Sequence, residues 1–195
     1  MNRTQTLLLS IVMLACLALA ACGPRGEADS PEGVGDGPVI VDALGRTVEF
    51  SELPQRIVIA GKSSLTIVDT LFLFPQAADR VAGLAVGRQK PGDFLQFVDP
   101  AFDEKSVLEV DAGPEQIVPL DPDVVVLRSF MAEKLGKSLE QIDIPVVYLD
   151  LETPEQYFRD LATLGKLFGN EARAAEIQSF YQVRLDRLDA ALDGL

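Results

Sequence analysis

Four basic side chains lie just beyond the ends of apolar runs in this sequence, where they are well suited to recognise a charged small molecule. These residues are Lys62, Arg88, Lys90 and Arg128. Arginine can pair with a carboxylate or phosphate through two parallel N–H bonds, whereas lysine acts as a point charge. The chain carries a net charge of −13, so a cluster of cations would reverse the local sign and attract an anion. The alternative is that these are ordinary solvated loop residues.

Hydroxyl and aromatic side chains accompany the basic residues at the same run ends. The predicted ligand-binding set is Lys62, Ser63, Ser64, Arg88, Lys90, Arg128 and Phe130. Phe130 and Met131 can line a pocket or belong to the core. Tyr148 lies inside an apolar run, which favours a structural role.

Several other chemistries are excluded by composition. The sequence has no His, so it has no Ser-His-Asp or Cys-His pair and no imidazole metal site. Its acidic balance disfavours nucleic acid as a partner. The two cysteines, Cys16 and Cys22, both lie before the globular part, so no disulfide, thiol metal site or Cys nucleophile is expected there. No catalytic residue, resident metal or cofactor is predicted, and the protein is not expected to be an enzyme.

The N-terminus has the pattern of a secretory signal. Arg3 precedes an apolar run at 7–21, which is shorter than the about 20 residues of a membrane span. The run ends in Leu-Ala-Ala-Cys, which resembles the lipobox of bacterial lipoproteins. The resemblance implies that residues 1–21 are removed and that Cys22 carries lipid anchoring the protein to the membrane. The alternatives are an ordinary cleaved signal with a chance Cys and an uncleaved anchor. Residues 22–38, rich in Gly and Pro, then form a flexible tether outside the cytoplasm.

Four short apolar runs dominate the part that follows. They occupy residues 57–60, 81–86, 124–127 and 146–149 and are rich in β-branched residues. Runs that are apolar on both faces are typical of parallel strands covered by helices on both sides. Their spacing leaves room for helical crossovers. We therefore predict an α/β fold: a three-layer lobe with a parallel sheet, preceded by a β-hairpin at 39–50.

Helices are predicted between and after these runs. The first helix follows Ser63 or Ser64, is capped by one of these hydroxyls and stops near Pro75. A second, short helix begins at Pro114, a third spans 131–142 and a fourth spans 154–168. A long amphipathic helix covers 171–195. Its apolar stripe consists of Ile177, Tyr181, Leu185, Leu188, Leu192 and Leu195. This stripe either packs back on the sheet or serves a partner that is missing.

Four segments together resemble the solute-binding proteins of ABC importers for iron–siderophores, haem and cobalamin. They are residues 41–48 (VDALGRTV), 54–58 (PQRIV), 113–125 (GPEQIVPLDPDVV) and 144–148 (IPVVY). The resemblance covers residues 39–195. It implies two α/β lobes joined by a long helix, of which this sequence matches the first lobe (39–170) and the linking helix (171–195), with the second lobe absent.

The same resemblance implies partners. They are a small anionic or metal-chelate ligand and an ABC permease, to which Glu115 would dock. A carboxylate at that position also suits the helix dipole, which is the alternative role for Glu115. A truncated interaction module, or half of a split receptor whose second lobe is a separate chain, is the alternative for the whole protein.

Two further motifs have to be weighed as other kinds of site. Residues 61–63 (GKS) resemble the end of a phosphate-binding loop, but Arg56 stands where that loop needs Gly. Asp150 and Glu152 offer oxygen ligands to a hard cation, although two carboxylates are few for calcium.

Overall fold

The computed structural model describes residues 37–85 and 94–193. The predicted signal peptide, Cys22, nearly all of the tether, Arg88, Lys90 and Leu195 lie outside these ranges. The predicted boundary between lobe and linking helix, at residue 170, stays a prediction.

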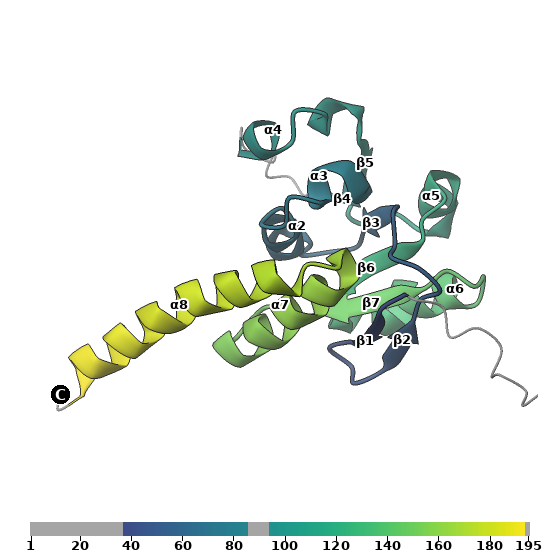
Figure 1. Ribbon diagram of the computed structural model, residues 1–195. Coiled ribbons are helices and arrows are strands. Elements are labelled where there is room, and N and C mark those ends of the chain that lie inside the picture. Colours follow the sequence, from purple (N-terminus) through teal and green to yellow (C-terminus); the bar gives the residue numbers. More distant parts are fainter. Residues whose placement is uncertain (1–36, 86–93, 194–195) are drawn as a thin grey trace, which may run out of the picture. The chain divides into compact units, whose positions relative to one another are not determined.

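A five-stranded parallel sheet forms the centre of the fold (Figure 1). Its strands are β3 (Ile57–Ile59), β4 (Val81–Ala85), β5 (Ser106–Leu108), β6 (Val124–Arg128) and β7 (Val146–Leu149). They lie in the order β5-β4-β3-β6-β7, and all neighbouring pairs are parallel. The four predicted strands and their direction are confirmed. The additional strand, β5, has only one fully buried residue, which is why it left no apolar run in the sequence.

Alternate residues of the central strands enter two separate hydrophobic cores, as the two-residue period of a strand requires. In β6, Val124 and Val126 belong to one core, and Val125 and Leu127 belong to the other. Figure 1 shows α2, α7 and α8 on one side of the sheet and α5 and α6 on the other. The predicted three-layer α/β class is confirmed.

The helical segments are short except for the last two. They are α2 (Leu65–Leu71), α3 (Ala77–Arg80), α4 (Phe94–Val98), η1 (Phe102–Glu104), α5 (Pro114–Ile117), η2 (Val118–Leu120), η3 (Ser129–Met131), η4 (Ala132–Gly136), α6 (Lys137–Glu140), α7 (Pro154–Phe168) and α8 (Glu171–Leu192). The helix predicted over 131–142 is a series of short turns instead. At Gly136 this series lies so close to the Tyr148 hydroxyl that a Cβ would collide with it, so the packing against β7 shapes the segment.

The predicted hairpin is present as β1 (Val39–Val41) and β2 (Thr47–Glu49), which pair antiparallel. It is attached to the sheet next to β7: the Ala43 amide donates to the Tyr148 carbonyl over 2.9 Å, and the Arg46 guanidinium donates to the Val146 carbonyl over 2.8 Å. The hairpin therefore covers the outer edge of β7.

Helices α7 and α8 form an antiparallel hairpin. The side chain of Thr153 accepts from the Gln156 amide and caps α7, and Gly169 ends the helix with a left-handed φ of 62°. The Gln178 side chain donates to the Phe158 carbonyl, and the rings of Tyr157 and Tyr181 meet edge to face at 5.2 Å. Since Tyr157 lies in the first turn of α7, the part of α8 after Tyr181 continues past the start of α7 (Figure 1).

Candidate ligand-binding edge

The order of the strands creates a switch point in the sheet. From β3 the chain adds β4 and β5 on one side, and then returns to add β6 and β7 on the other side of β3. In open α/β sheets ligands bind beyond the carboxyl ends of the strands at such a point. Here that point lies between the loop after β3 and the turn after β6, so the candidate site starts with Gly61–Ser64 and Arg128–Phe130.

The loop after β3 packs tightly against β6 and its following turn. Gly61 has a φ of 81°, and a Cβ on it would lie 3.3 Å from the Met131 side chain. Lys62 and Ser63 are exposed, with Ser63 at a φ of 57°. Ser64 is buried, and its hydroxyl donates to the Ala85 carbonyl over 2.7 Å. The prediction that a serine hydroxyl caps α2 is therefore wrong. Ser64 occupies the N-cap position, but its hydroxyl bonds to β4 and makes no side-chain cap bond to the helix.

Arg128 does not stand free at the edge. Its side chain is only 5% exposed and its guanidinium pairs with the Glu152 carboxylate, which is 64% exposed. The Nε atom of Arg128 is buried, and no described atom accepts a hydrogen bond from it. The expectation of an open cation at this position needs correction, since burial and Glu152 already hold the guanidinium.

The remaining charges beside Arg128 form a connected network that sequence reasoning missed. Asp160 is fully buried and accepts from the amides of Asp150 and Leu151 over 2.7 and 2.9 Å. Arg159 pairs with Asp160 over 2.8 Å and with Asp150 over 2.9 Å, and Asp150 also accepts from the Ser129 hydroxyl. Leu151 has a φ of 58°, a strained value for a bulky residue, which these bonds stabilise.

The sign of the charge at this part of the edge differs from the prediction. Among the described residues around Arg128 and Arg159, three carboxylates face two guanidinium groups. A purely cationic rim is therefore not what the ends of β6 and β7 present. Lys62 stays an exposed cation across the switch point, and Arg88 and Lys90 lie outside the described residues.

The predicted metal alternative has no support in the described part of the chain. Asp150 and Glu152 are each engaged by an arginine. No group of three acidic, His or Cys side chains within the described ranges could hold a metal ion.

The residues predicted to line the pocket or to dock to a permease differ in their exposure and position. Tyr148 and Met131 are buried in the core, whereas Phe130 is exposed. Glu115 is exposed in the first turn of α5, and its carboxylate folds back against Gly113 at the start of that helix. It lies on the crossover from β5 to β6 and has no described hydrogen bond or ion pair with the loops after β3 and β6.

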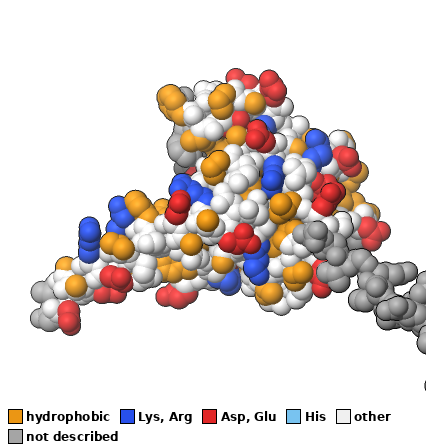
Figure 2. All heavy atoms as spheres, in the orientation of Figure 1, with side chains coloured by type: hydrophobic (Ala, Val, Ile, Leu, Met, Phe, Trp, Pro, Cys, Tyr) orange, Lys and Arg blue, Asp and Glu red, His pale blue; other side chains and the backbone are white. Residues whose placement is uncertain are grey.

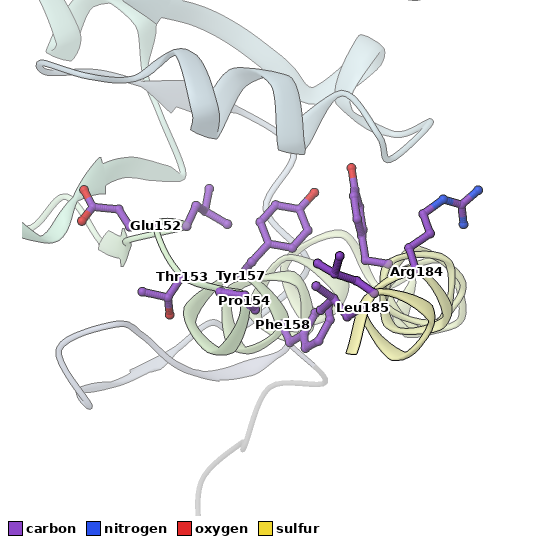
Figure 3. Close-up of a pocket in the computed structure, with 10 residues that line it drawn as sticks. Glu152, Thr153, Pro154, Tyr157, Phe158, Arg184 and Leu185 are labelled. Carbon is purple, nitrogen blue, oxygen red and sulfur yellow. The ribbon is translucent and has the colours of Figure 1, made fainter. Parts of the chain in front are cut away.

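A groove of about 470 Å³ has Glu152, the partner of Arg128, in its lining. Figure 3 shows its lining residues. The groove is lined by Leu151, Glu152, Thr153, Pro154, Tyr157, Phe158, Tyr181, Arg184, Leu185 and Leu188. Tyr157 and Phe158 come from α7, and Leu185 faces them from α8 (Figure 3). The stripe of α8 is divided: Ile177 is buried against the lobe, whereas Leu188 and Leu192 are exposed. Figure 2 shows hydrophobic side chains exposed among charged ones along the projecting part of this helix.

Comparison with known proteins decides the family. A profile described as periplasmic binding protein matches residues 77–195, which is more than half of the chain. The chain belongs to the periplasmic binding protein family. This is a non-enzymatic class of solute-binding proteins, and membership implies a location outside the cytoplasm. Among the residues described in this family member, no helix is long and apolar enough to cross a membrane.

This periplasmic binding protein spans only about half the length of the solved structures that it matches. The TroA-like FepB of Veillonella parvula is 23% identical with a TM-score of 0.67, over 81% of this chain and 50% of that one. The molybdate-binding MolA of Haemophilus influenzae is 17% identical with a TM-score of 0.67, over 80% and 54%. A periplasmic haem-binding protein of Pseudomonas aeruginosa is 24% identical with a TM-score of 0.55, over 69% and 46%. No curated protein sequence matches the chain.

Proposed function

We propose that this chain is the solute-capturing part of an ABC importer, held outside the cell membrane by lipid, and that it binds an anionic solute at the switch point of its sheet. The observation that carries the proposal is the meeting of the β3 and β6 loops at the carboxyl edge, in a chain of a solute-binding family. The residues proposed to contact solute are Lys62, Ser63, Arg128 and Phe130, with Arg88 and Lys90 from the segment after β4. Ser64 supports the loop instead, because its hydroxyl is already bonded.

The proposed solute is an iron chelate, haem, cobalamin or a related ligand that carries an anionic group. Relatives with this fold bind molybdate and haem, which are both anionic. Lys62 supplies an exposed positive charge and Arg128 a planar donor group on the two sides of the same switch point. Both are suited to carboxylate or other oxyanion groups.

The proposed anchor is lipid on Cys22, followed by the tether at 22–38. The net charge of −13 supports attachment by lipid and not by direct contact, because an acidic surface is repelled by anionic lipid. We further propose that Glu115 docks to the permease, which its exposure on α5 permits.

Titration of the purified chain with molybdate, ferric citrate, haemin and cobalamin tests the solute proposal, read by calorimetry and thermal unfolding. We expect one of them to bind and to raise the melting temperature, since a ligand that binds only the folded state stabilises it. Lys62→Ala is expected to weaken that binding, whereas Lys134→Ala, at another exposed lysine, is expected to leave it unchanged. Absence of binding by all four solutes would argue against the proposal.

The docking proposal is tested separately with the cognate permease in vesicles. Glu115→Lys reverses the charge and is expected to reduce transport without changing solute affinity. Transport at the unmodified rate would refute a docking role for Glu115.

A second candidate function is that of an interaction module that requires a separate partner lobe. The exposed outer part of α8 and the adjoining apolar groove favour it. Light scattering of the purified chain, with and without candidate partner chains from the same operon, distinguishes the two. A partner that binds α8 and is needed for solute affinity would favour this alternative.

A further inference from the structure

Arg128 is the one arginine of the β6–β7 edge whose donors are poorly used among the described residues. It is buried, yet its only described partner is Glu152, and its Nε atom has none. Arg159, in contrast, is 39% exposed and binds two carboxylates. A buried guanidinium with unused donors loses hydration without full compensation, so it has a strong tendency to accept a better anionic partner.

The three carboxylates near this edge differ in how firmly they are held. Asp160 is fully buried and is fixed by two backbone amides and Arg159. Asp150 is bound by Ser129 and Arg159 and is 17% exposed. Glu152 has one side-chain partner, and its carboxylate is largely in water. Glu152 is therefore the carboxylate that can leave at the lowest free-energy cost, because water can solvate it at once.

We propose that Glu152 is an exchangeable internal counter-ion of Arg128, which a carboxylate or other oxyanion group of the solute must displace. This inference rests on the proposed function, since it concerns the same edge of the sheet. A planar oxyanion can receive two parallel N–H bonds from a guanidinium, whereas Glu152 receives bonds from Nη2 alone. The pair thus favours solutes that carry such a group over solutes without one, which cannot replace the charge that Glu152 supplies.

The charge count gives the direction of the expected effect. With Glu152 in place, the described cluster has three carboxylates and two guanidinium groups; with Gln at 152 the two signs balance. Glu152→Gln removes both the competitor and a repulsive charge. In the unmodified chain an incoming anion must first break the hydrogen bond between Glu152 and Arg128. Because a hydrogen bond to a charged group stabilises the unbound form, its removal is expected to tighten anion binding by roughly tenfold or more.

The test uses citrate as the probe, measured by calorimetry on the full chain. The matched control is Glu176→Gln, since Glu176 is likewise exposed (67%) and pairs with an arginine, Arg173, on α8. We expect the dissociation constant of citrate to fall about tenfold in Glu152→Gln and to stay unchanged in Glu176→Gln. A second variant carries both Arg128→Gln and Glu152→Gln. Removing both partners preserves folding better than removing one of them, because no buried charge is left unpaired. This double variant is expected to lose the gain in citrate affinity.

Three results would overturn the inference: equal citrate affinity of Glu152→Gln and the unmodified chain, no citrate binding by either, or a gain that persists without Arg128. The solute titration of the unmodified chain is read independently. If haemin or another solute binds but its affinity is the same in Glu152→Gln, the solute-binding function stands and the counter-ion role is wrong.

Discussion

Replacing Asp160 by Asn tests whether the buried carboxylate holds the turn between β7 and α7. Asp160 accepts from two backbone amides and from the Nε atom of Arg159, all over 2.7–2.9 Å. Asn keeps one oxygen for the amides but turns its own N–H donors toward Arg159, so the charge-assisted bond to Arg159 is lost. The two amide bonds become neutral and weaker.

The expected loss can be built from these three bonds. A hydrogen bond to a charged group contributes about 1.5–3 kcal/mol, and a neutral one about 1 kcal/mol. Losing the bond to Arg159 and weakening the other two gives a decrease of about 3 kcal/mol in the free energy of unfolding. Arg159 keeps Asp150 as a partner and is partly solvated, which limits the loss. For a folded part of this size, the melting temperature should fall by about 6–12 °C.

Urea unfolding followed by circular dichroism measures this loss, since the chain has no Trp to report by fluorescence. Asp189→Asn makes the same chemical change at an exposed position of α8 and should alter stability by less than about 0.5 kcal/mol. A loss below about 1 kcal/mol in Asp160→Asn would refute the view that the carboxylate carries the turn.

Three other predictions concern the tyrosines, the helical hairpin and the anchor. Burial raises the pKa of Tyr148 and of Tyr157 to about 12, against 10.0 in the unfolded chain, so their contribution to stability is complete below pH 10 and is lost as the pH rises toward 12. Ultraviolet titration should show late ionisation, with one late phenol missing in Tyr148→Phe. Gly165→Ala puts a Cβ 2.8 Å from a side chain of α8 and should lower the free energy of unfolding by about 1–3 kcal/mol in urea, whereas an unchanged midpoint would contradict the close approach. Cys22→Ser should abolish incorporation of labelled fatty acid and release the protein from the membrane fraction; retention there would contradict the lipid anchor.

The elements that could be predicted from the sequence are those fixed by local patterns. The runs at 57–60 and 124–127 are β-branched and apolar on both faces, which few structures other than buried parallel strands satisfy. The bounds of α7 follow from Pro154 at its start and Gly169 at its end. β5 escaped prediction because only Leu108 of its three residues is buried, so it carries no periodic pattern.

The details of the site depend on partners far apart in the sequence, which local patterns do not encode. Arg128 and Glu152 are 24 positions apart, and only the parallel pairing of β6 with β7 brings their strand ends together. The sequence contained one usable indication. Arg128 directly follows the apolar run at 124–127, and Glu152 lies three residues after the end of the next run, at 146–149. The left-handed turn at Leu151 gave no indication, because bulky residues rarely adopt it.

The groove beside α8 shares Glu152 with the ion pair at the strand ends. Any molecule that fills the groove and favours one position of this carboxylate therefore also changes the free energy with which Arg128 holds an anion. By thermodynamic reciprocity, an anion on Arg128 must change the affinity of the groove by the same factor. If Glu152 is the exchangeable counter-ion proposed above, occupation of the groove and anion binding at Arg128 are therefore coupled through one carboxylate.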